Sequence, residues 1–81
     1  MSISVHFLGF QRALAKVERV KVPLIADMCV ADVLNFITEQ FPQLSLRENE
    51  VFAMVNDQVC MNDRILQSND TVSFFPHIGG G

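Results

Sequence analysis

The stretch VADVLNFITEQF, residues 30–41, decides the fold because its apolar residues recur every three or four positions. In an α-helix these residues line one face: Val30, Val33, Leu34, Ile37 and Phe41. Cys29 precedes the helix at the N-cap position, where an oxygen-bearing side chain is usual, and Asp32 lies near the positive end of the helix dipole. Pro42 ends the helix because proline has no backbone N–H to donate. We expect one main helix with a single apolar face.

The residues before this helix alternate between apolar and polar, as half-buried strands do. Ile3, Val5 and Phe7 form the apolar half of the first strand, and Gly9 breaks it. Residues 12–16 are expected to form a short helical turn. A second strand over residues 17–22 ends at Pro23, which has no N–H to donate to a neighbouring strand. Two strands therefore precede the helix.

Three further short strands are expected after the helix. Residues 51–55 form the third strand, and Asn56-Asp57 makes a tight turn into a fourth strand over residues 58–61. Asn56 tolerates the positive φ angle that such a turn needs. A loop then leads to the last strand, residues 71–75, which ends at Pro76.

The order of two strands, one helix and three short strands predicts a single sheet with one face covered by one helix. With the first and last strands central, this is the β-grasp, or ubiquitin-like, fold. It is an α+β fold with a mixed sheet of four to five strands and one main helix packed on one face. We expect residues 1–76 to form this domain and residues 77–81 to form a flexible C-terminal glycine tail.

Composition and charge exclude several classes of protein. With 49% hydrophobic and 19% charged residues, the chain of 81 residues is globular rather than disordered and large enough for one core. A net charge of −3 argues against nucleic-acid binding and suits a basic protein partner better. The sequence has neither an apolar run long enough to span a bilayer nor a basic segment followed by an apolar stretch at its start. A cytoplasmic location is expected.

The cysteines and histidines do not suggest a metal site. Cys29 and Cys60 lack the spacing of zinc or iron–sulfur ligands, and we expect reduced, packed side chains. His6 and His77 are far apart in sequence and have no acidic or thiol companions. No metal is predicted.

The chain ends Phe74-Phe75-Pro76-His77-Ile78-Gly79-Gly80-Gly81, so its side chains disappear toward the terminal carboxylate. Glycine has no Cβ and can thread a narrow passage into a partner's active site. The carboxylate of Gly81 is then the reactive group, and the pocket belongs to another protein. The competing interpretation is a frayed terminus without function, which is common at the ends of domains.

This ending resembles that of the small subunit of molybdopterin synthase, whose typical C-terminus is V-A-F-F-P-P-V-A-G-G. The resemblance also covers the segment GFQRAL (residues 9–14), Phe41-Pro42 and the Val55-Asn56 turn. It departs at His77, where that family has a second proline, and at residues 68–70, where it has Asp-Gly-Asp. The chain is therefore identified as similar to this ubiquitin-like sulfur-carrier family.

The resemblance implies that the chain carries sulfur. An E1-like enzyme would use ATP to adenylate Gly81, and a sulfur donor would convert the adenylate to a thiocarboxylate. The large subunit of molybdopterin synthase would receive the tail, in a heterotetramer, and pass the sulfur to the pterin precursor. The chain would be a sulfur-carrying subunit without a bound cofactor or an active-site pocket of its own.

Strand alternation separates residues that hold the fold from residues that could dock. Alternate residues of a strand lie on opposite faces of the sheet. We expect the helix to cover one set of side chains in the first and last strands: Ile3, Val5, Phe7, Val72 and Phe74. The opposite face would then carry the other set: His6, Leu8, Ser73 and Phe75. We expect Leu8 and Phe75 to be exposed anchors. In the family, matching positions contact the large subunit, as does the position of Val59. The resemblance implies that the partner also binds Pro76, His77, Ile78 and Gly79, and that Gly80 belongs with Gly81 to the reactive end of the chain. Arg12 also matches a family position, and we expect it to form a structural ion pair.

Other functions stay open. The same thiocarboxylate could feed the synthesis of thiamine, cysteine or another sulfur-containing metabolite. A ubiquitin-like modifier would instead link the activated terminus to a lysine of a target protein. A plain interaction module would leave the tail unreacted. The length and the Phe-Phe-Pro ending favour the molybdopterin synthase subunit over the shorter thiamine carriers.

Overall fold

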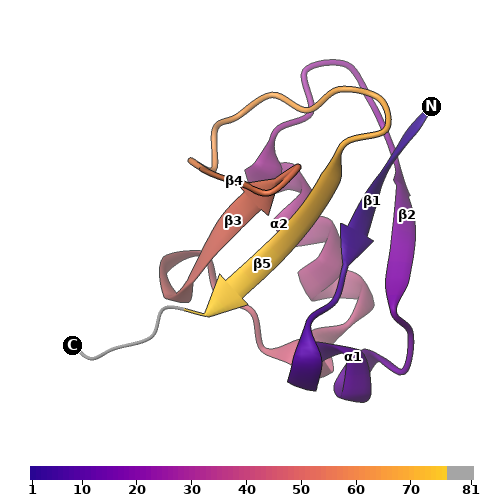
Figure 1. Cartoon of the computed structure of the whole chain (residues 1–81), viewed down its shortest axis with the longest axis vertical. Helices are drawn as coiled ribbons and strands as arrows, with labels where there is room; N and C mark the ends of the chain where they lie inside the picture. The colour runs from indigo at the N-terminus through magenta and orange to yellow at the C-terminus, as the bar shows by residue number, and fades with distance from the viewer. Residues whose placement is uncertain (77–81) are drawn as a thin grey trace.

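The computed structural model describes residues 1–76, except for the side chain of Glu48. Its helices are α1 (Gly9–Ala15) and α2 (Val30–Gln40), and two short 3₁₀ helices follow at Pro42–Leu44 and Glu48–Glu50. Its strands are β1 (Ser2–His6), β2 (Arg19–Pro23), β3 (Val51–Val55), β4 (Gln58–Cys60) and β5 (Thr71–Pro76). They form one sheet in the order β2-β1-β5-β3-β4 (Figure 1).

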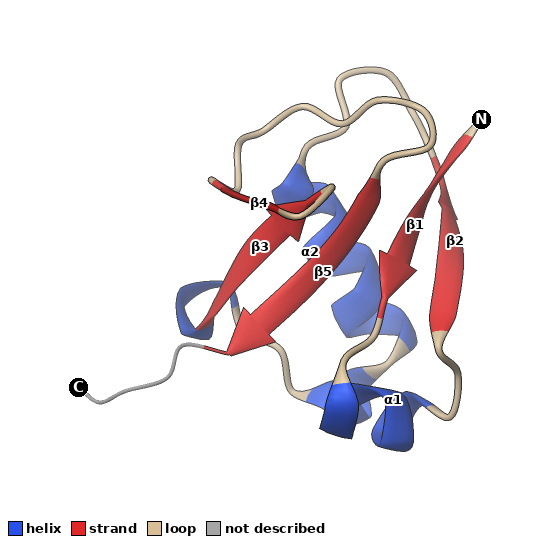
Figure 2. Ribbon diagram, viewed as in Figure 1, coloured by secondary structure: helices blue, strands red, loops and turns tan. Residues whose placement is uncertain are grey.

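The sheet is mixed, as the sequence predicts for a β-grasp fold. β1 and β5 run parallel, with Ser4 beside Thr71, and all other neighbouring strands are antiparallel. α2 lies across one face of the sheet, and α1 lies at one end (Figure 2). The opposite face, here called the outer face, carries no helix in the part of the chain that the structure describes. The predicted α+β, ubiquitin-like fold is confirmed.

The core lies between α2 and the sheet. The predicted apolar stripe of α2 supplies four buried side chains, and the alternation of β1 and β5 supplies four more: Val30, Val33, Leu34, Ile37, Ile3, Val5, Val72 and Phe74. Phe41 caps α2 and is only half-buried, with its ring edge against Phe7 at a centroid distance of 5.2 Å. Each of these side chains removes apolar area from water, which stabilises the fold.

The first helix differs most from expectation. We expected a turn over residues 12–16, whereas α1 runs from Gly9 to Ala15 and Lys16 lies beyond its end with φ 65°. Gly9, at φ 28°, lets the chain turn directly from β1 into this helix. β2 consequently begins at Arg19 rather than at Val17, and β4 ends at Cys60, one residue early.

The turn between β3 and β4 is the predicted one. Asn56 and Asp57 have φ angles of 51° and 70°, the positive values that match the twist of a two-residue hairpin. Asn56 also donates from Nδ2 to Oδ1 of the buried Asp70 at 2.9 Å, and its own Oδ1 accepts from the N–H of Thr71 at 3.0 Å. The hairpin is thereby fixed to the start of β5.

Candidate partner-docking face at the end of the last strand

The end of β5 is held by Gln11, a buried polar residue of α1. Successive backbone carbonyls along β5 point alternately toward β1 and toward β3. The carbonyl of Asp70, just before β5, accepts from the N–H of Ser4 in β1, and the next carbonyl, that of Thr71, accepts from the N–H of Asn56 beside β3. The carbonyl of Phe74 therefore faces the β1 side, where β1 has already ended at His6. Gln11 takes the place of a strand there and donates from Nε2 to this carbonyl at 2.8 Å.

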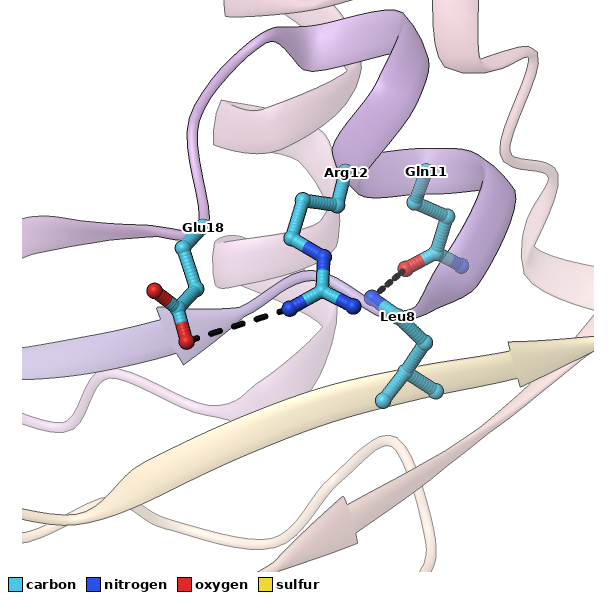
Figure 3. Close-up of polar contacts among 4 residues, drawn as sticks. All are labelled: Leu8, Gln11, Arg12 and Glu18. Atoms are coloured by element: carbon cyan, nitrogen blue, oxygen red, sulfur yellow. Dashed lines mark hydrogen bonds and ion pairs between the residues drawn. The ribbon is translucent and has the colours of Figure 1, made fainter.

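The same side chain closes the start of α1. The Oε1 atom of Gln11 accepts from the backbone N–H of Leu8 at 3.1 Å, which satisfies one of the free donors at the helix start (Figure 3). Gln11 is 1% exposed. It thus ties the segment that carries Leu8 to the strand that carries Phe75. Sequence reasoning missed this residue, because no periodicity marks a single buried amide.

Phe75 lies on the outer face, as the alternation predicts, but it is half-buried rather than exposed. Its ring stacks on that of Phe52, the residue opposite it on β3, with centroids 5.2 Å apart and planes 13° apart. Such cross-strand aromatic pairs stabilise a sheet and cover part of each ring. Leu8, at the N-cap of α1, is also half-buried rather than exposed.

Val59 shares this face. It lies opposite Met54 on β3, and Met54 lies opposite Ser73 on β5, so all three follow the orientation of Phe75. Val59 is 67% exposed. We call Phe52, Met54, Val59 and Phe75 the apolar face. Phe52 and Met54 alternate with the buried Val51, Ala53 and Val55, so strand parity alone could have found them.

A shallow hollow of about 320 Å³ borders the apolar face. It is lined by Val51, Phe52, Val59, Cys60, Met61 and Asn62. Met61, one of the lining residues, is 75% exposed. Because Phe52 belongs to both the hollow and the stacked pair, the hollow and Phe75 form one continuous surface. An apolar side chain of a partner could enter there.

Arg12 forms the ion pair that the sequence suggested. Its Nη1 lies 3.9 Å from Oε1 of Glu18, and both side chains are more than half exposed (Figure 3). Exposed pairs of this kind contribute little to stability. Arg12 therefore connects α1 loosely to the segment before β2.

The remaining predicted site residues lie outside the described part of the chain: His77, Ile78, Gly79, Gly80 and Gly81. Pro76 is the last described residue. It is exposed and lies opposite Val51 at the end of β5. Phe75 belongs to the apolar face and directly precedes Pro76, so the apolar face lies beside the end of β5.

Residues 1–76 hold no cluster of three or more His, Cys, Asp or Glu side chains suited to a metal ion. Cys29 and Cys60 are half-buried thiols without a disulfide. None of the helices described is both long and apolar enough to cross a bilayer.

Comparison with known proteins identifies a family for this chain. The model of the ThiS family matches residues 5–81. None of the curated proteins compared with the chain matches it in sequence. Among solved structures, SAMP1 from Haloferax volcanii is similar with a TM-score of 0.82 and 19% identity, over 100% of both chains.

Two further structures are similar in fold. The putative molybdopterin converting factor subunit 1 of Pyrococcus furiosus has a TM-score of 0.82 at 22% identity, over 96% of this chain and 99% of that one. A chain in the complex of subunits 1 and 2 of the molybdopterin-converting factor of Helicobacter pylori has a TM-score of 0.67 at 20% identity, over 100% of both chains. Because the family model extends from residue 5 to the last glycine, this protein belongs to the ThiS family of ubiquitin-like sulfur carriers and modifiers.

Proposed function

We propose that this protein is the sulfur-carrying small subunit of a molybdopterin synthase, with the carboxyl group of Gly81 as its reactive group. The observation that carries the proposal is the family match, which runs through Gly80-Gly81 to the end of the chain. The Phe-Phe-Pro ending before the tail favours this subunit over other carriers of the family. The chain itself supplies the reagent, and the large subunit supplies the pocket.

The chemistry begins with activation of a poor electrophile. A carboxylate must be given a leaving group before sulfur can displace one of its oxygens. An E1-like enzyme joins the Gly81 carboxylate to the α-phosphate of ATP and releases pyrophosphate. A sulfur donor then displaces AMP and leaves a thiocarboxylate, whose sulfur is nucleophilic at neutral pH. ATP is a substrate of the activating enzyme, so this chain needs no bound cofactor.

The apolar face is the proposed contact with the large subunit. Phe75 and Phe52 form its centre and Val59 its exposed margin. Buried aromatic anchors contribute much of the affinity at protein interfaces. In Helicobacter pylori, subunit 1 of the molybdopterin-converting factor is found in a complex with subunit 2. We extend that arrangement to this chain, with Pro76 and the tail directed into the partner and two copies of each subunit forming a heterotetramer.

Reconstitution tests the proposal. The purified chain is combined with the activating enzyme, ATP, a sulfur donor, the large subunit and the pterin precursor, and conversion of the precursor is measured. We expect conversion with the full chain and none with a chain lacking Gly81. If the loaded chain delivers sulfur only to an acceptor enzyme of thiamine synthesis, that pathway replaces the one proposed. Attachment of the chain to lysines of other proteins would identify a modifier instead.

A further inference from the structure

Basic side chains are concentrated in one short segment of this acidic protein. Residues 12–21 contain four of the six Lys and Arg residues of the chain, Arg12, Lys16, Arg19 and Lys21, and only one carboxylate, that of Glu18. The whole chain carries a net charge of −3. The segment comprises the second half of α1, the following turn and the first residues of β2. One end of the sheet is therefore positive although the protein is negative.

Strand register places two of these charges on the outer face. Arg19 lies opposite His6 and Lys21 lies opposite Ser4, whereas the alternate residues Ile3 and Val5 of β1 are buried against α2. Residues opposite each other on neighbouring strands share a face. The side chains of Arg19 and Lys21 thus project from the face not covered by α2, and both are exposed. We call Lys16, Arg19 and Lys21 the basic strip.

The charges of the basic strip have no ion-pair partner among the described side chains of residues 1–76. Among the described side chains, the ion pairs join Arg12 to Glu18 and Arg47 to Glu50. No carboxylate pairs with Lys16, Arg19 or Lys21 in that part of the chain. A group of like charges without counter-charges produces a local positive potential that attracts an acidic surface and speeds its association.

β2 is also an edge strand, and its residues limit how a partner can approach. Among the strands of residues 1–76, it pairs only with β1. Pro23 has no N–H to donate, and charged side chains on an edge discourage the addition of a further strand. An occupant therefore contacts the exposed side chains of the outer face rather than the backbone of β2.

We propose that the basic strip is a second docking site, which binds the acidic surface of a protein partner. β2 and β4 lie at opposite edges of the sheet, four strand spacings or roughly 19 Å apart. Arg19 and Lys21 lie on β2 and Val59 lies on β4, so the basic strip and the exposed margin of the apolar face are at opposite edges of the sheet. One protein can hold the chain through β2 while another receives the end of β5. A nucleic acid is the less suitable ligand, because three charges on an acidic protein neutralise few phosphates.

NMR titration of the ¹⁵N-labelled full chain tests this site independently of the proposed function. The probes are a short peptide that alternates Glu and Leu, and an oligothymidylate of equal length. We expect the peptide to shift amide signals of β1 and β2, and its affinity to fall as salt is added. The double variant Arg19→Glu/Lys21→Glu should bind the peptide about tenfold or more weakly, because two favourable charge contacts become repulsive.

The matched control is Arg47→Glu/Arg64→Glu, which changes the net charge by the same amount away from the strip. It should retain the affinity of the parent chain. If the amide spectrum shows that charge reversal disturbs folding, the variant Arg19→Gln/Lys21→Gln replaces the charge-reversal variant in the same titration. Absence of peptide binding, equal weakening by both double variants, or shifts confined to other strands would overturn the proposal. Tighter binding of the oligothymidylate than of the peptide would also overturn it.

Discussion

Replacement of Gln11 by leucine should destabilise the protein through two orphaned backbone groups. The carbonyl of Phe74 loses the amide that donates to it at 2.8 Å, and it is buried. The N–H of Leu8 loses its acceptor at 3.1 Å, but it is only partly buried, so water can replace part of that bond. An orphaned buried group costs about 1–3 kcal/mol, which predicts a loss of roughly 2–3 kcal/mol in the free energy of unfolding.

This loss is large enough to measure without unfolding the protein. A domain of 81 residues has a stability of roughly 4–12 kcal/mol. Urea denaturation should show a lower midpoint for Gln11→Leu with an unchanged slope. The matched control is Gln43→Leu, which removes an exposed side-chain bond of 3.3 Å to the carbonyl of Leu14 and should cost about 0.5 kcal/mol or less. If the two variants were equally stable, Gln11 would not hold the end of β5.

Three further changes test the core, the docking face and the tail. Phe74→Ala should cost about 3–5 kcal/mol because Phe74 is 2% exposed, whereas Phe75→Ala should cost about 1–2 kcal/mol, mainly its stacking on Phe52, in the same urea assay. By calorimetric titration, Phe75→Ala should bind the large subunit roughly thirtyfold more weakly, and unchanged affinity would rule out the docking model. Leu34→Ala should cost about 2–5 kcal/mol by leaving a cavity under α2, and parental stability would mean that the helix face is wrong. Deletion of Gly80-Gly81 should abolish adenylation with little change in melting temperature, since glycine buries little apolar surface; a large drop in melting temperature would count against a purely functional tail.

The main elements of the fold could be predicted because local pattern and burial agree in them. The four buried residues of α2 follow the helical period, and β3 has the predicted bounds because its alternation matches one buried and one outer face. The Asn56-Asp57 turn follows from the tolerance of these residues for positive φ angles. In each case, residues within a few positions of one another in the sequence are enough to predict the element.

Features that depend on distant contacts could not be predicted. α1 is short, and its buried Gln11 donates to the carbonyl of Phe74, which is far away in sequence. The alternation placed Phe75 on the correct face, but its half-burial depends on the stack with Phe52, which requires the register between β3 and β5. The basic strip at the far edge of the sheet is a mixed case: the alternation of β2 assigns Arg19 and Lys21 to the outer face, but only the register of β1 with β2 places them opposite His6 and Ser4.

The most direct test of the sulfur-carrier account is the intact mass of the chain after incubation with the activating enzyme, ATP and a sulfur donor. The account predicts the mass gain that accompanies exchange of one oxygen atom for sulfur. Fragmentation should place this gain on Gly81, and omission of ATP should abolish it. An unchanged mass in the complete reaction, or attachment of the Gly81 carboxyl group to a lysine in place of sulfur, would contradict the account.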